Sequence, residues 1–154
     1  MKVLIACEFS GVVREAFRKR GHDAWSCDLI PSEIPSKYHI IGDVTKLLKK
    51  KWDLIIAFPP CTYLCVSGAR WFKDRMKEQD RALRFIKLIM KAKCPRICIE
   101  NPIGVISTKI RKPDQIVHPY HFGENESKAT CLWLKNLPPL KYTKVIPGDR
   151  KSVV

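Results

Sequence analysis

The stretch Asp53-Leu54-Ile55-Ile56-Ala57-Phe58-Pro59-Pro60-Cys61 decides the fold. Its first six residues are mostly apolar and do not alternate with polar ones, which is typical of a parallel strand buried on both faces. Proline cannot donate to a central ladder, so the strand must end before the Pro-Pro pair. Because the two prolines also stiffen the exit, the stretch predicts an interior strand that presents a cysteine thiol at the edge of the sheet.

Apolar runs on both sides of this stretch predict a sheet with helices between its strands. The further strands are expected over residues 2–6, 24–27, 38–41, 96–100 and 131–134, the last antiparallel to the others. The expected helices cover residues 10–20, with Ser10 as N-cap, 44–50 and 75–93, while residues 103–127 should be irregular apart from one short helix. The fold class is therefore α/β, a mostly parallel sheet with helices on both faces. Residues 1–140 form the one domain, and residues 141–154 form a basic C-terminal tail.

Composition excludes several classes of protein. No apolar run approaches the roughly 20 residues of a membrane span, so no membrane partner is expected. The chain turns acidic at Glu8, too early for a secretion signal, and its odd number of cysteines, seven, indicates reduced thiols in the cytoplasm. The pairs Cys61/Cys65 and Cys94/Cys98 lack the two-residue spacing and the histidine pair that zinc favours, so no metal site is expected.

The charge favours a nucleic-acid partner. The net charge is +14, and residues 46–96 alone hold fourteen basic and four acidic side chains. The basic stripe along the helix 75–93, which includes Lys91, is interpreted as a solvated face. The side chains expected to contact nucleic acid lie instead in loops: Arg70, Trp71, Lys73, Arg75, Lys109, Arg111, Lys112 and Lys128.

Acidic residues follow several of the expected strands. Asp28 lies about 20 residues after the first turn, where dinucleotide folds place the carboxylate that binds ribose hydroxyls. Asp43 follows the next strand and could accept a hydrogen bond from an adenine amino group. Since the first turn has only Gly11 and no full glycine-rich fingerprint, a nucleoside cofactor without phosphates is favoured. Glu100-Asn101 ends another strand, where burial would raise the pKa of the glutamic acid and pair it with the Cys61 nucleophile.

Together these motifs resemble the catalytic core of the cytosine-5 DNA methyltransferases. The resemblance rests on Phe9-Ser10-Gly11, Asp28, Asp43, Pro59-Pro60-Cys61 with Ser67-Gly68, Glu100-Asn101-Pro102 and Lys128-Ala129-Thr130-Cys131-Leu132-Trp133-Leu134. It implies a Rossmann-like methyltransferase fold, S-adenosylmethionine as cofactor and double-stranded DNA as substrate. It also implies a cofactor site made of Phe9, Ser10, Gly11, Asp28, Leu29, Asp43, Val44 and Pro59. In that family Cys61 would add to carbon 6 of cytosine, while Glu100 holds ring nitrogen 3 and Asn101 fixes the glutamic acid and the base.

The chain also departs from the family. Thr62 stands where the family has glutamine, and Lys128 and Thr130 stand where it has two arginines. The expectation is a small stand-alone core of a bacterial or virus-infected cell, without a target-recognition domain. Such a core would read a short target and could self-associate as a homodimer. Two alternatives stay open: an inactive nucleic-acid-binding relative, and the same chemistry on RNA or a nucleotide.

Overall fold

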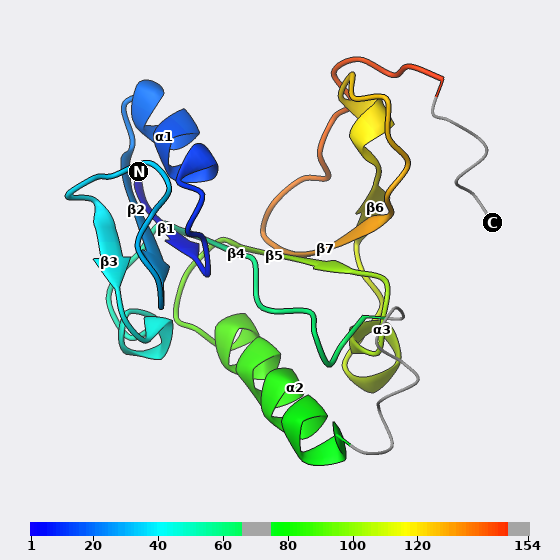
Figure 1. Ribbon diagram of the computed structural model, residues 1–154, viewed down its shortest axis with the longest axis horizontal. Helices are drawn as coiled ribbons and strands as arrows, with labels where there is room; N and C mark the ends of the chain where they lie inside the picture. The colour runs from blue at the N-terminus through cyan, green and yellow to red at the C-terminus, as the bar shows by residue number, and fades with distance from the viewer. Residues whose placement is uncertain (66–74, 148–154) are drawn as a thin grey trace.

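A computed structural model describes residues 1–65 and 75–147 of the chain. Its strands form one sheet of seven in the order β3-β2-β1-β4-β5-β7-β6 (Figure 1). The strands are β1 (Lys2–Ala6), β2 (Asp23–Asp28), β3 (His39–Ile41), β4 (Leu54–Ala57), β5 (Ile97–Pro102), β6 (Gln115–Val117) and β7 (Thr130–Lys135). The pairs among β1 to β5 are parallel, and β7 runs antiparallel to both of its neighbours. The predicted fold class is confirmed.

Helices cover both faces of this sheet (Figure 1). They are α1 (Val12–Lys19), α2 (Met76–Met90) and α3 (Ile106–Lys109), with the 3₁₀ turns η1 (Val44–Lys46) and η3 (Pro119–His121). Alternate residues of β1 face the two layers: Val3 and Ile5 belong to the core cluster that includes Phe17 of α1, and Leu4 and Ala6 to the cluster that includes Ile86 of α2. Because both of its faces are buried, β1 has no polar alternation.

The predicted helix boundaries differ from those of the structure, and the helix expected over residues 75–93 already ends at Met90. The first helix begins at Val12, not at Ser10, and its N-cap is Gly11, which has the left-handed φ of 81° that suits glycine. The Ser10 hydroxyl still accepts from the Val12 N–H at 3.3 Å. The helix predicted over residues 44–50 is only the turn η1, which Asp43 caps, because the Leu47 carbonyl accepts from the Lys50 N–H and the Trp52 indole instead of continuing a helix.

The described part of the basic tail packs against the domain. The Tyr142 ring stacks on His121 with 3.9 Å between the ring centroids. The Lys144 N–H donates to the carbonyl of His121 at 3.2 Å, and the Ile146 N–H to that of Tyr120 at 3.0 Å. Backbone hydrogen bonds and ring stacking thus hold residues 142–146 against the η3 segment. No helix within the described ranges is long and apolar enough to cross a membrane.

The strand order reverses direction between β1 and β4. From β1 the chain builds outward to β3, and it then returns to add β4 and β5 on the other side. In open parallel sheets a crevice forms at such a reversal, outside the carboxyl ends of the two strands. The segments that leave β1 and β4, residues 7–11 and 58–65, therefore border the expected binding site.

Candidate active site

Cys61 lies in a tight turn just past β4. Its carbonyl accepts hydrogen bonds from the N–H groups of Leu64 and Cys65, at 2.9 and 3.0 Å. Leu64 is buried and anchors the turn, whereas Cys61 is only half-buried. The Pro-Pro pair thus delivers a thiol to the sheet edge within a hydrogen-bonded turn, as the sequence indicates.

Asn101 joins this turn to the neighbouring strand β5. Its side chain is 1% exposed, and its Nδ2 donates a hydrogen bond of 2.9 Å to the Pro59 carbonyl. Its Oδ1 is also buried and has no hydrogen-bond partner among the described residues. A buried acceptor without a donor is costly, so the site contains an unused acceptor for a ligand or water.

Glu100 lies beside Cys61 and is partly buried. Burial raises the pKa of Glu100, and this effect outweighs a hydrogen bond from the Thr130 side chain and the charge of Lys128, which both lower it. The pKa of Cys61 is also raised, mainly by burial, next by Cys65 and to a smaller degree by the charge of Glu100. Both shifts favour the protonated form more than in a free side chain, which suits Glu100 to the role of a proton donor.

Two residues that the sequence analysis missed hold the Cys61 turn in place. A Cβ on Gly104 would overlap the Leu64 carbonyl, and the Val105 N–H donates to that same oxygen at 2.8 Å. From the other side, the buried Gln79 of α2 donates to the Tyr63 carbonyl at 3.0 Å. The only sequence signals were a glycine shortly after Glu100-Asn101 and a glutamine on the apolar face of a helix, and neither signal points to a partner.

A pocket of about 430 Å³ opens beside the turn, at the ends of β1, β2 and β3. Four of the predicted cofactor residues line it: Asp28, Leu29, Asp43 and Val44. The pocket also contains residues that were not predicted, including Cys7, Pro60 and Phe85 of α2. Its volume lies within the range of small-molecule sites.

The two acids of the pocket keep one carboxylate oxygen each for a ligand. Asp28 Oδ1 accepts from the Leu29 N–H at 2.7 Å, and Asp43 Oδ1 accepts from the N–H and hydroxyl of Thr45 at 2.9 and 2.8 Å. Within the described ranges, neither Oδ2 has a hydrogen-bond partner. The hydrogen bonds from Thr45 also lower the pKa of Asp43, so its carboxylate remains an acceptor.

The buried Glu8 occupies the N-terminus of α1. Its carboxylate accepts from the N–H groups of Val13 and Arg14, at 2.8 and 3.2 Å. Dinucleotide folds bind a pyrophosphate at this helix end. Since the Glu8 side chain already accepts from these donors, the start of α1 is not available to a pyrophosphate, which favours a nucleoside without phosphates. The residues present therefore fit S-adenosylmethionine better than a dinucleotide.

The other predicted site residues are spread more widely. Phe9, Ser10, Gly11 and Pro59 do not line the pocket, although they belong to the two segments that border it. Arg70, Trp71 and Lys73 lie outside the described residues. Of the remaining basic residues, Arg75, Lys109, Lys112 and Lys128 are exposed. Arg111 is exposed as well, but it forms an ion pair with Asp114 at 3.0 Å and donates to the Leu134 carbonyl.

No protein-family model matches the sequence, and no curated protein is significantly similar to it. Solved structures do match the fold. One is a "putative DNA modification methyltransferase" encoded within an E. coli prophage, with a TM-score of 0.52 and 17% sequence identity. The match covers 87% of this chain and 46% of that one, so this chain spans about half the length of the neighbour. The chain has a methyltransferase-like Rossmann fold.

Proposed function

We propose that the protein transfers a methyl group from S-adenosylmethionine to carbon 5 of cytosine in DNA, through a covalent adduct of Cys61. The observation that carries the proposal is the convergence of Cys61, Glu100 and Asn101 at one sheet edge, next to the pocket lined by Asp28 and Asp43. The fold likeness to a DNA modification methyltransferase also supports it. A base within a duplex is out of reach of such an edge, so the target cytosine must be flipped out.

In the proposed mechanism the residues of this chain act on the pyrimidine ring. The Cys61 sulfur forms a bond to carbon 6 after it loses its proton, and the ring becomes an enamine that is nucleophilic at carbon 5. Glu100, whose raised pKa favours the protonated form, donates to ring nitrogen 3 and withdraws electrons from carbon 6. After methylation, water acting as base removes the proton from carbon 5, and the electron pair of that bond restores the double bond to carbon 6. The bond between carbon 6 and Cys61 then breaks with its electrons on sulfur, and nitrogen 3 returns its proton to Glu100.

The cofactor contributes one element to this chemistry: when bound, S-adenosylmethionine supplies an electrophilic methyl group. Asp28 would accept hydrogen bonds from its ribose hydroxyls and Asp43 from its adenine amino group. Both acids line the same pocket and keep an oxygen available, which supports this assignment.

The test is incubation with S-adenosylmethionine and a duplex that contains 5-fluorocytosine. Fluorine at carbon 5 cannot leave as a proton does, so the Cys61 adduct should persist through denaturing electrophoresis. The Cys61→Ser variant should form no adduct, and Cys65→Ser should form it normally. A protein that binds the duplex without any adduct would instead be an inactive nucleic-acid-binding relative, and adducts on RNA alone would change the substrate.

A further inference from the structure

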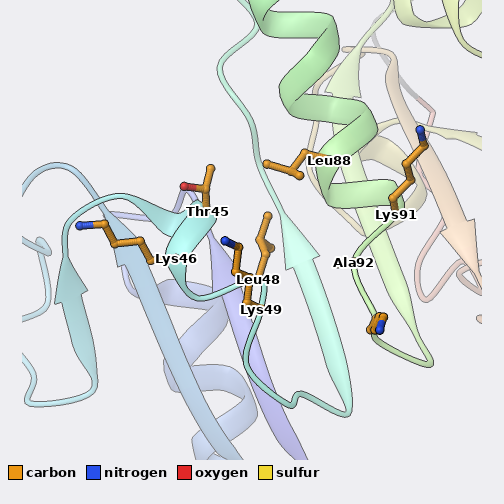
Figure 2. Close-up of a pocket in the computed structure, with 8 residues that line it drawn as sticks. Thr45, Lys46, Leu48, Lys49, Leu88, Lys91 and Ala92 are labelled. Atoms are coloured by element: carbon orange, nitrogen blue, oxygen red, sulfur yellow. The ribbon is translucent and has the colours of Figure 1, made fainter.

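A second pocket, of about 650 Å³, lies between the η1 segment and the C-terminal half of α2 (Figure 2). Four lysines line it: Lys46, Lys49, Lys91 and Lys93. Lys46 and Lys49 come from η1 and the turn after it, whereas Lys91 and Lys93 follow the end of α2, so the pocket brings together parts of the chain that are about 45 positions apart. We call this pocket the lysine groove.

None of the four ammonium groups of the lysine groove forms an ion pair among the described residues, although the pKa of Asp43 nearby is lowered by hydrogen bonds from Thr45 and also by the charge of Lys46. Within the described residues no carboxylate lines the groove. All four lysines are exposed. Like charges around one pocket repel each other and concentrate a positive potential there, so the groove attracts anions.

The floor of the groove is apolar but narrow. Leu48 and Ala92 are buried, and Leu88 is 47% exposed. A membrane-binding surface needs several large apolar side chains that can enter the lipid, and this groove offers one. Lysines around a small apolar surface suit a sugar-phosphate backbone instead. Its sugars can contact Leu88 while its phosphates contact the ammonium groups.

The lysine groove adjoins the candidate cofactor pocket. Thr45 lines both pockets. On α2, Phe85 lines the cofactor pocket and Leu88 the groove, and positions three residues apart on a helix are neighbours on its surface. A chain bound in the groove would therefore lie beside the candidate cofactor pocket.

We propose that the lysine groove binds the phosphodiester backbone of nucleic acid, outside the nucleotides that enter the active site. A duplex carries one negative charge per roughly 1.7 Å of its axis, so a groove with four lysines can contact several phosphates at once. The proposal gives Lys91 a role other than that of the solvated stripe to which the sequence analysis assigned it. The inference rests on the proposed function only in its choice of DNA, since such binding needs no chemistry at Cys61.

The test removes the four charges and measures the salt dependence of DNA binding. In the absence of cofactor, fluorescence anisotropy with a labelled duplex gives the dissociation constant at several salt concentrations. The variant K46Q/K49Q/K91Q/K93Q should show a slope of log K against log salt that is shallower by about 2 to 4, at about 0.9 per phosphate contact. The matched control K19Q/R20Q/K37Q/K141Q removes the same charge from exposed positions elsewhere, and its slope should change by less than about 1.

Several outcomes would overturn the proposal. Equal changes in the two variants would mean that only net charge matters, and an unchanged slope in the groove variant would mean that the groove does not bind DNA. A poly-glutamate peptide of equal charge is also tested as a competitor. If it displaces the duplex from the native protein but not from the groove variant, that result would assign the groove to an acidic protein instead of DNA. A thermal melt shows whether both variants fold. If the protein transfers no methyl group but the groove variant still shows the shallower salt dependence, the proposed function is wrong and this inference holds.

Discussion

The side-chain amide of Asn101 donates a 2.9 Å hydrogen bond to the carbonyl of Pro59, which ties the end of β5 to the segment that presents Cys61. Asn101→Ala should leave this carbonyl without its donor and destabilise the protein by about 1–3 kcal/mol. Methyl transfer should fall as well, because the turn loses an anchor. Chemical denaturation and a methylation assay check the two effects. Asn101→Asp, which has the same shape but no donor, should behave like the alanine variant, and full activity in Asn101→Asp would contradict this role.

Cys61 and Cys65 provide an internal comparison of two thiols in one turn. Cys61→Ser should abolish methyl transfer and leave DNA binding nearly intact, because a hydroxyl is a much weaker nucleophile than a thiolate. Cys65→Ser should retain most of the activity. Both variants are to be measured with tritiated cofactor and with duplex binding. The reverse pattern would assign the nucleophile to Cys65.

Asp28 should determine how tightly the cofactor is held. Asp28→Ala should weaken S-adenosylmethionine binding by about 1–3 kcal/mol, since ligand hydroxyls would lose their acceptor. Isothermal titration calorimetry measures this directly. Glu33→Ala removes an exposed carboxylate from the loop that follows β2 and should change the affinity little. No binding by the intact protein would favour an inactive relative.

Glu100 should make stability depend on pH. Its folded pKa is raised by burial above the ordinary value of 4.5, so between these two values the folded state binds more protons than the unfolded state. Stability from this group is therefore complete below pH 4.5 and is lost as the pH rises through the folded pKa. Melting temperatures between pH 4 and 8 should show this decline in the native protein and a smaller one in Glu100→Gln. Turnover of that variant should fall by about 10² to 10⁴-fold, and unchanged turnover would remove Glu100 from the mechanism.

Gly104 tests how closely the segment after β5 must approach the Cys61 turn. In Gly104→Ala the new methyl group would overlap the Leu64 carbonyl, so the turn has to shift. We expect a loss of about 1–3 kcal/mol in stability together with reduced methyl transfer. Ser107→Ala on α3 adds no bulk and is the control. Normal stability and activity in Gly104→Ala would show that the close approach is not required.

Local patterns in the sequence predicted the parts of the fold that depend on burial. Strands β1 and β4 are continuous apolar runs, and α2 has apolar residues at helical spacing, so each of them was found. The three-residue strand β6 was missed, because Gln115-Ile116-Val117 is too short for a pattern and owes its structure to pairing with β7. Residues 44–50 looked helical, but beyond η1 the Leu47 carbonyl accepts from the Lys50 N–H and the Trp52 indole, and this contact could not be predicted from local spacing.

The candidate site shows the same division. Residues at strand ends, such as Asp28 and Cys61, could be placed from the sequence, because parallel strands all end at one edge. Phe85 could not be placed, since it reaches the pocket only when α2 packs on the sheet. The role of Glu8 was missed because the sequence offered Ser10 as an ordinary cap, whereas the longer carboxylate reaches the helix from the end of β1.

The Glu8 carboxylate at the start of α1 has a consequence for selectivity in the cell. Nucleoside triphosphates and dinucleotides share the adenosine group that the pocket is proposed to bind, and they are abundant competitors. Their phosphates would meet a fixed negative charge at a helix end whose donors are already used. A cofactor whose sulfonium and amino groups are positive meets no such repulsion. Under the proposed function, the Glu8 carboxylate would therefore disfavour any nucleotide whose phosphates reach the start of α1.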